Sequence, residues 1–153
     1  MGWRVRAVRG ATTVSENTVT AMREAVHELL DELEAYNSLD MEEVVSVTFS
    51  VTPDLDAIFP AAIARERPNW NTVPLIDVQH MAVAGSLQKC IRFLIHFNTP
   101  NPNQSIHHPY MRGARHLRPD WVSAQTAALK ATASATTDAA RKIPLADGAA
   151  IGG

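Results

Sequence analysis

Two arginines stand where the sequence otherwise predicts apolar β-structure. Arg92 lies inside the run Cys90–Asn98, and Arg9 follows an alternating run that begins at Trp3. If that strand continues to Arg9, its side chain shares a face with the apolar residues before it. A buried guanidinium needs an acceptor or a bound anion, because an unpaired buried charge is costly. One explanation is an internal salt bridge between Arg92 and Asp77. The other, favoured by two such arginines on neighbouring strands, is an anion-binding pocket.

The other reactive groups give weaker signals. Tyr110 and Arg118 lie on or after the last predicted strand, where they could complete an anion pocket. Histidines are numerous, but no HExxH, CxxC or comparable spacing is present, so we expect no metal site. Gly10 and Gly85 belong to no glycine-rich phosphate loop. Cys90 lies in no motif of an activated nucleophile and is expected to pack as a small apolar side chain.

Strands and helices must position these residues. Apolar residues at helical spacing predict a long amphipathic helix that begins near Ser15 or Thr18 and ends at Tyr36. A short helix is expected from Pro60 to Glu66, before Pro68. Alternating or apolar runs predict five strands, over residues 3–8, 44–52, 73–79, 90–98 and 108–117.

The pattern within the strands indicates how the sheet is covered. In the strand 44–52, Val45, Val47, Phe49 and Val51 are expected on one face. The strand 90–98 is apolar on both faces apart from Arg92 and His96, which is typical of a central buried strand. One long helix cannot cover both faces of such a sheet. The pattern therefore favours an α+β fold whose bare face is covered by other copies of the chain.

Composition sets the broad class. The chain has 153 residues, a net charge of −2 and a single cysteine. We expect one domain over residues 1–122 and a low-complexity, flexible tail over 123–153, transiently helical between Ala124 and Arg141. Nothing indicates nucleic-acid or membrane binding, an internal disulfide or a signal peptide, so we expect a cytoplasmic protein.

Four blocks of the sequence together resemble one enzyme family. "VRGATTV", "SVTPDLDAIFPAAIARE", "GSLQKCIRFLIHFN" and "HPYMRGARHLRPD" are similar, in order and spacing, to the trimeric, mixed α/β (AroH) class of chorismate mutase. The resemblance implies a mixed sheet with helices on one side, and three chains packed into a pseudo-α/β-barrel with active sites between neighbours. It implies the rearrangement of chorismate to prephenate, in phenylalanine and tyrosine biosynthesis, without a cofactor or metal.

The resemblance also implies roles for individual residues. Arg92 corresponds to the cation that stabilises the breaking ether oxygen, and Arg9 and Tyr110 bind the carboxylate region of the substrate. Arg118 folds over the entrance when ligand binds. The remaining residues implied to bind the substrate are Phe59, Ala61, Arg65, His80 and Leu117. Of these, Phe59 and Ala61 form an apolar wall supplied by the neighbouring chain, and Arg65 is a second carboxylate partner at the cleft mouth.

Three positions depart from the family pattern. His80 stands where the family usually has glutamate, Asp77 stands where cysteine is frequent, and Ala62 stands where lysine can occur. We hypothesise that Asp77 supplies the missing carboxylate. The alternatives to a chorismate mutase are a non-catalytic, small-molecule-binding trimer of the same fold and a small enzyme acting on enamines or imines.

Overall fold

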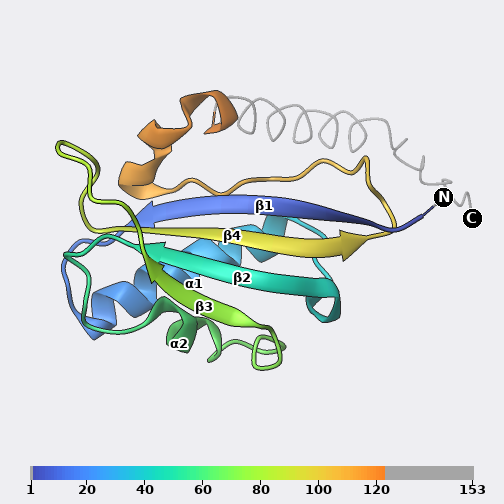
Figure 1. The fold of residues 1–153 in the computed structure, drawn as a ribbon, viewed down its shortest axis with the longest axis horizontal. Helices are drawn as coiled ribbons and strands as arrows, with labels where there is room; N and C mark the ends of the chain where they lie inside the picture. The colour runs from blue at the N-terminus through green and yellow to red at the C-terminus, as the bar shows by residue number, and fades with distance from the viewer. Residues whose placement is uncertain (1, 123–153) are drawn as a thin grey trace, which may run out of the picture. The chain divides into compact units, whose positions relative to one another are not determined.

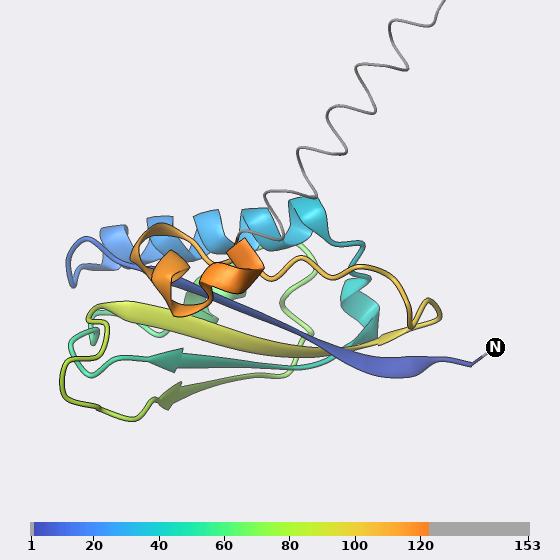
Figure 2. The ribbon, with the colours of Figure 1, turned by 90° about the horizontal axis from the view of Figure 1, so that it is seen from above.

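The computed structural model describes residues 2–122, which form one sheet with both α-helices on one side (Figures 1 and 2). The strand order is β1 (Arg4–Thr13), β4 (Cys90–Thr99), β2 (Val44–Val51) and β3 (Leu75–Gln79). β4 is antiparallel to β1 and β2, whereas β3 is parallel to β2. The prediction that β4 is central is therefore confirmed. The predicted tail lies outside the described residues.

The helices begin close to the predicted positions, α1 next to Thr18 and α2 at Pro60. α1 (Val19–Tyr36) is capped by Thr18, whose side chain accepts a hydrogen bond from the Ala21 N–H at 3.1 Å. Its apolar stripe packs on β1, β2 and β4 in one core that includes Phe49 and Phe93. α2 (Pro60–Ala64) is shorter than predicted, because its last turn continues to Glu66 as i→i+3 hydrogen bonds.

The predicted fifth strand is wrong. Only Tyr110 bridges to β1, at Ala11, and a 3-10 helix, η2 (Arg112–Leu117), follows. Pro109 has no N–H to donate to a ladder, and Arg112 adopts a φ of 50°, which ends the extended conformation. Only the segment at Tyr110 therefore pairs with β1, and the chain from Arg112 onward leaves the sheet.

The sheet faces also differ from the sequence pattern at two places. In β1, Val8 is buried against the helices, so the row that holds Trp3, Val5 and Arg9 lies on the opposite face. The expectation that Arg9 ends a core-facing row is wrong. In β2, a bulge between Val44 and Ser46 buries Val44 and leaves Val45 46% exposed, although Val47 and Phe49 are buried as predicted.

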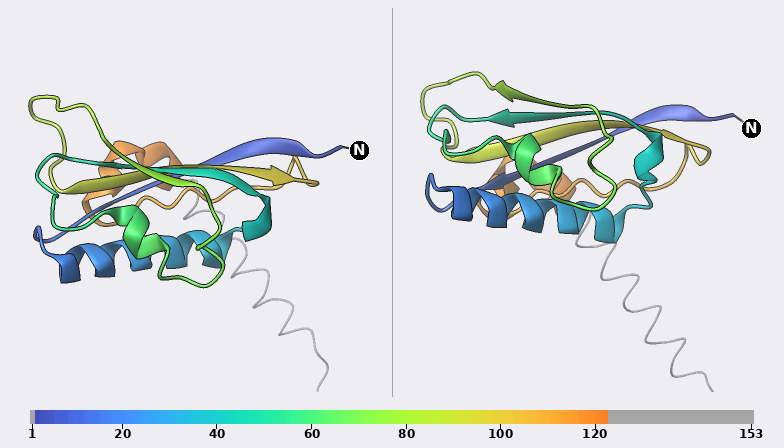
Figure 3. Two further views of the ribbon diagram at one scale, coloured as in Figure 1. Left: turned by 60° about the horizontal axis from the view of Figure 1, so that its bottom comes forward. Right: turned by 90° about the horizontal axis from the view of Figure 1, so that it is seen from below.

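The face opposite the helices is largely open. No α-helix of the described residues covers it (Figure 3), and η2 covers only the corner at Ala11. Apolar side chains are exposed there on the edge strand β3, where Ile76 is 59% exposed and Val78 is 40% exposed. No helix within residues 2–122 is long and apolar enough to cross a membrane.

Candidate active site

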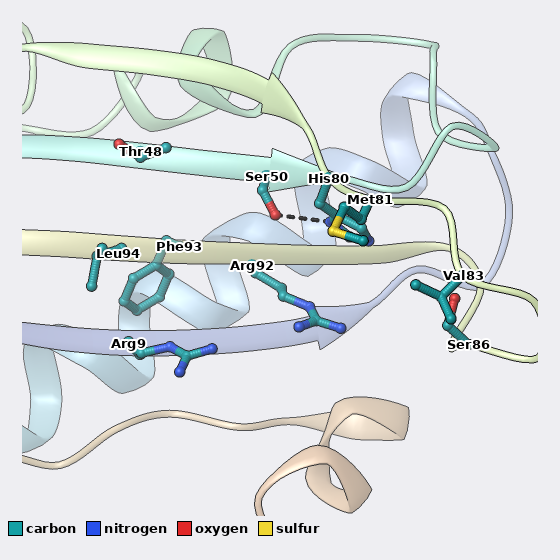
Figure 4. Close-up of a pocket in the computed structure, with 10 residues that line it drawn as sticks. All are labelled: Arg9, Thr48, Ser50, His80, Met81, Val83, Ser86, Arg92, Phe93 and Leu94. Atoms are coloured by element: carbon teal, nitrogen blue, oxygen red, sulfur yellow. Dashed lines mark hydrogen bonds between the residues drawn. The ribbon is translucent and has the colours of Figure 1, made fainter.

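Two arginines meet on the open face of the sheet. Arg9 pairs with Leu94 and Arg92 pairs with Ala11, so the two arginines are diagonal neighbours on adjacent strands. They share a cavity of about 480 Å³, in which both side chains lie on the same side of the sheet (Figure 4). The prediction of two arginines on neighbouring strands is confirmed. The remaining lining residues are Thr48, Ser50, His80, Met81, Val83, Ser86, Phe93 and Leu94.

Arg92 is half-buried, and none of the described residues neutralises its charge. Its Nε atom is buried without a hydrogen-bond partner, and no salt bridge to Arg92 is present within residues 2–122. Arg92 lies close enough to Cys90 to oppose the rise that burial causes in the pKa of the thiol. A guanidinium held in this way favours the binding of an anion, because the free energy of desolvating its charge is spent on folding and not on binding.

The internal salt bridge between Arg92 and Asp77 is not formed. β2 lies between β3 and β4, and Asp77 pairs with Phe49, whose side chain faces the helices. The Asp77 carboxylate accepts a hydrogen bond from the Ala61 N–H at 3.0 Å. Burial raises the pKa of Asp77, against that hydrogen bond and the charge of Arg65. Asp77 and Arg92 of one chain therefore face opposite sides of the sheet.

His80 lies in the same cavity as the two arginines. Its Nδ1 is hydrogen-bonded to the Ser50 hydroxyl at 2.8 Å (Figure 4), which leaves Nε2 for other partners. Burial and the nearby charge of Arg92 lower the pKa of His80, so the imidazole is neutral at pH 7. Ser50 had no motif to mark it, but the alternation of β2 places it beside Arg92.

Tyr110 joins this group from the segment before η2. It is buried over Ala11, and Leu117 packs against the same small cluster. Burial raises the pKa of Tyr110, whereas the charges of Arg9, Arg118 and Arg92 lower it, so the phenol has three guanidiniums near it. The Arg9 backbone N–H also donates to His108 Nδ1 at 3.0 Å, a contact that no sequence pattern indicated.

The remaining predicted residues form a second group, beside α2 and β3. Phe59 and Asp77 line a separate cavity of about 590 Å³, and Phe59 is 70% exposed. Ala61 is buried next to them, and the exposed Arg65 is near enough to act on the Asp77 carboxylate. A single chain thus contains two separate half-sites: the cationic half-site, with Arg9, Arg92, His80 and Tyr110, and the edge half-site, with Phe59, Ala61, Arg65 and Asp77.

The residues of the cationic half-site fit anion binding better than proton transfer or metal chemistry. No group of three or more metal-ligating side chains is present within residues 2–122. The cavity instead combines two guanidiniums with a neutral imidazole, and the Tyr110 phenol lies near the guanidiniums. Fold and cavity together define a mixed α/β domain whose open sheet face is suited to binding a small anion.

Comparison with known proteins identifies the family. The sequence model of the chorismate mutase type I family matches residues 5–121, and the chain belongs to that family. It is 40% identical over 116 residues to chorismate mutase AroH of Bacillus subtilis, covering 76% of this chain and 91% of the relative. It is 44% identical over 122 residues to chorismate mutase AroH of Thermus thermophilus, covering 79% and 99%.

A solved structure supports the same assignment. The fold matches a chorismate mutase from Clostridium thermocellum with a TM-score of 0.67 and 42% sequence identity. The match covers 72% of this chain and 97% of that chain. The family that the four sequence blocks predicted is confirmed, and so is a mixed α+β fold with helices on one side of the sheet, with four strands in place of five. The trimer stays a prediction.

Proposed function

We propose that this chorismate mutase converts chorismate to prephenate in a cleft that the cationic half-site of one copy forms with the edge half-site of another. The observation that carries the proposal is Arg92, a half-buried guanidinium with no neutralising partner among the described residues, beside Arg9 on an uncovered sheet face. Family membership supplies the reaction. Loss of chorismate, followed by ultraviolet absorbance, tests it, and the rate enhancement is expected to disappear in Arg92→Ala.

The reaction requires charge and shape from the protein. In this pericyclic rearrangement one C–O bond breaks and one C–C bond forms within one molecule, so no nucleophile or general base is needed. Arg92 stabilises the negative charge that develops on the ether oxygen, which favours the transition state over the ground state. Arg9 and Tyr110 bind a carboxylate and hold the substrate in its reactive conformer, which lowers the entropic part of the barrier.

The edge half-site closes the cleft from the second copy. Phe59 supplies an apolar wall, Ala61 lies beside it, and Arg65 binds a second carboxylate at the mouth. The exposed apolar side chains on β3 support assembly, because an uncovered sheet edge with such residues is suited to pairing with another chain. A closed ring of copies gives every cationic half-site one edge half-site. The family resemblance implies three copies in the ring, so we propose a homotrimer.

Asp77 is the proposed carboxylate of the edge half-site. Within its own chain it lies on the wrong face to reach Arg92, so it acts in the cleft formed with a neighbouring copy. There it accepts a hydrogen bond from the ring hydroxyl of the substrate, the role that the family usually gives to a glutamate at the position of His80. Asp77→Asn keeps the shape of the side chain and is expected to lower turnover. Turnover equal to that of the parent protein contradicts this role.

Mixing two inactive variants tests the shared cleft. Arg92→Ala damages only the cationic half-site, and Arg65→Ala damages only the edge half-site. The two variants are unfolded together in equal amounts and refolded into random trimers. Each half-site of a cleft is then intact in about half of the cases, so both are intact in about a quarter of the clefts, and about a quarter of the parent activity returns. A mixture no more active than the sum of the separate variants refutes the shared cleft.

The oligomeric state is tested at β3. Ile76→Lys places a charge on the exposed apolar edge strand, and we expect it to dissociate the assembly and abolish turnover. Val19→Lys is the matched control, because Val19 is an exposed apolar residue at the start of α1, on the other side of the sheet. Sedimentation velocity measures both. A trimer that persists in Ile76→Lys with full activity contradicts the proposed assembly.

A further inference from the structure

The last described residues bring a third arginine to the cationic half-site. Arg118 follows η2, and its charge acts on Tyr110 together with those of Arg9 and Arg92. The other two arginines project from strands whose backbones are fixed by the sheet. Arg118 instead projects from a turn, and a long side chain there loses considerable rotamer freedom when it is held in one place. A fixed position of the Arg118 guanidinium therefore requires local contacts that offset this loss of rotamer freedom.

Trp121 makes that contact. The Arg118 Cζ atom lies 3.4 Å from the centroid of the Trp121 ring, the geometry of a stacked cation–π pair. The backbone N–H of Trp121 also donates to the Arg118 carbonyl at 3.1 Å, which closes the turn that brings the two side chains together. Asp120 accepts hydrogen bonds from Arg118 Nε and Nη2 at 3.1 and 2.9 Å.

The Trp121 ring is itself fixed to the cationic half-site. It stacks on His108 with centroids 4.2 Å apart and an interplanar angle of 19°, and it meets Tyr110 edge to face at 5.8 Å. His108 in turn accepts the Arg9 backbone N–H. A continuous series of contacts thus runs from the backbone of β1 at Arg9, through His108 and Trp121, to the Arg118 guanidinium.

We propose that Trp121 is a positioning residue that holds the Arg118 guanidinium near Tyr110 of the cationic half-site, where it can bind a carboxylate of the substrate. The inference rests on the proposed function and adds a residue to it. The expectation that Arg118 folds over the entrance when ligand binds stays a prediction; in the structure its guanidinium is held by Trp121 and Asp120. Because Asp120 already satisfies the guanidinium, a substrate carboxylate replaces Asp120 instead of ordering a free side chain. Pre-organisation of this kind favours substrate capture.

A double-mutant cycle tests the proposal. Trp121→Leu and Arg118→Ala are each expected to raise the KM for chorismate about three- to tenfold, with kcat within about twofold of the parent value. The double variant is expected to have the KM of Arg118→Ala alone, because the tryptophan acts only through the arginine. Trp121→Phe keeps an aromatic face and is expected to restore most of the loss.

A matched control separates positioning from general packing. Tyr36 contacts the neighbouring histidine, His107, with ring centroids 4.9 Å apart, but it lies on α1. Tyr36→Leu is expected to leave KM unchanged. If Trp121→Leu fails to fold, as judged by circular dichroism, Trp121→Met and Trp121→Phe carry the same comparison, because methionine fills the space without an aromatic face.

The outcomes distinguish this inference from the proposed function. A parent protein that does not consume chorismate overturns the proposed function, and the inference falls with it. If the parent protein is active, only the inference is overturned by any of three results: an unchanged KM in Trp121→Leu, additive effects in the double variant, or no rescue by phenylalanine.

Discussion

Replacing the two arginines of the cavity by lysine, one at a time, is expected to change different kinetic constants. Arg92 is half-buried, with its Nε atom shielded from water, whereas Arg9 is exposed. A cation in a water-excluded position is worth more to a developing charge than one in solvent. Arg92 is proposed to act on the ether oxygen, which becomes charged only in the transition state. Arg9 is proposed to bind a carboxylate, which is charged throughout.

The structure sets the size of the first effect. In Arg92→Lys the charge remains, but the Nε–H and the planar fork are lost. The strand cannot shift to compensate, because Ile91 and Phe93 on either side are buried in the core. Removing one well-placed donor of this kind costs about 3–4 kcal/mol, so we expect kcat to fall by about 10²- to 10³-fold with little change in KM.

Arg9→Lys is the matched comparison. Its contribution is equal in the ground state and the transition state, so KM is expected to rise about tenfold while kcat changes little. Both constants come from initial rates of chorismate loss, with circular dichroism to verify the fold. The reasoning is refuted if Arg92→Lys retains its kcat, or if both variants change only KM.

Two further predictions concern stability. Gly10→Ala places a Cβ against the Phe93 ring and 2.8 Å from the Pro109 carbonyl oxygen, so it is expected to cost about 1–3 kcal/mol by overpacking. Thermal unfolding should show a larger fall in Tm than for Gly113→Ala, whose added Cβ meets only the Thr13 side chain, at 3.0 Å. Burial, together with the charges of His107, Arg118 and Arg9, lowers the pKa of His108 to about 4, so below its unfolded pKa of about 6.5 the unfolded state binds more protons. Stability is therefore expected to fall between pH 6.5 and 4, and the fall should be smaller in His108→Gln; an identical pH profile contradicts the assignment.

The sequence predicted α1 and the central strand well, because each carries its own signal. Thr18 and the stripe of buried leucines define α1, and a mostly apolar run predicts a strand with neighbours on both sides. The orientation of β1 could not be predicted in the same way. Alternation divides a strand into two rows, but it does not say which row faces the helices when both contain small or apolar residues, and the row of Arg9 was therefore assigned to the wrong face.

The candidate site was only partly accessible to sequence reasoning for a related reason. The pairing of Arg92 with Asp77 assumed that their strands are adjacent, but strand order is a tertiary property, and β2 is inserted between them. The sequence predicted an extended segment after Tyr110, but the positive φ of Arg112 ends the extended conformation there. Trp121 lies in no motif, and its position against His108 and Arg118 follows from that turn.

The imidazole of His80 has a consequence for how the cleft binds its substrate. A carboxylate at this position reduces the positive charge around Arg92, whereas a neutral imidazole held by Ser50 does not. Two charged groups affect the pKa of His80. Arg92 lines the same cavity, and Asp54, in the loop between β2 and α2, has the weaker effect. The cavity therefore presents the undiminished charge of its arginines to a dianion, and attraction of this kind is screened by salt.

That difference gives a measurable prediction. The KM for chorismate is expected to rise with ionic strength in the parent protein. In His80→Glu the added negative charge raises KM at low salt and makes its dependence on ionic strength shallower, whereas His80→Gln keeps the neutral charge and the parent slope. A steeper slope in His80→Glu contradicts the charge argument. Because the rearrangement transfers no proton, a neutral group can occupy this position as long as Arg92 keeps its proposed orientation toward the ether oxygen. The kcat of His80→Gln measures how far the imidazole contributes to that orientation.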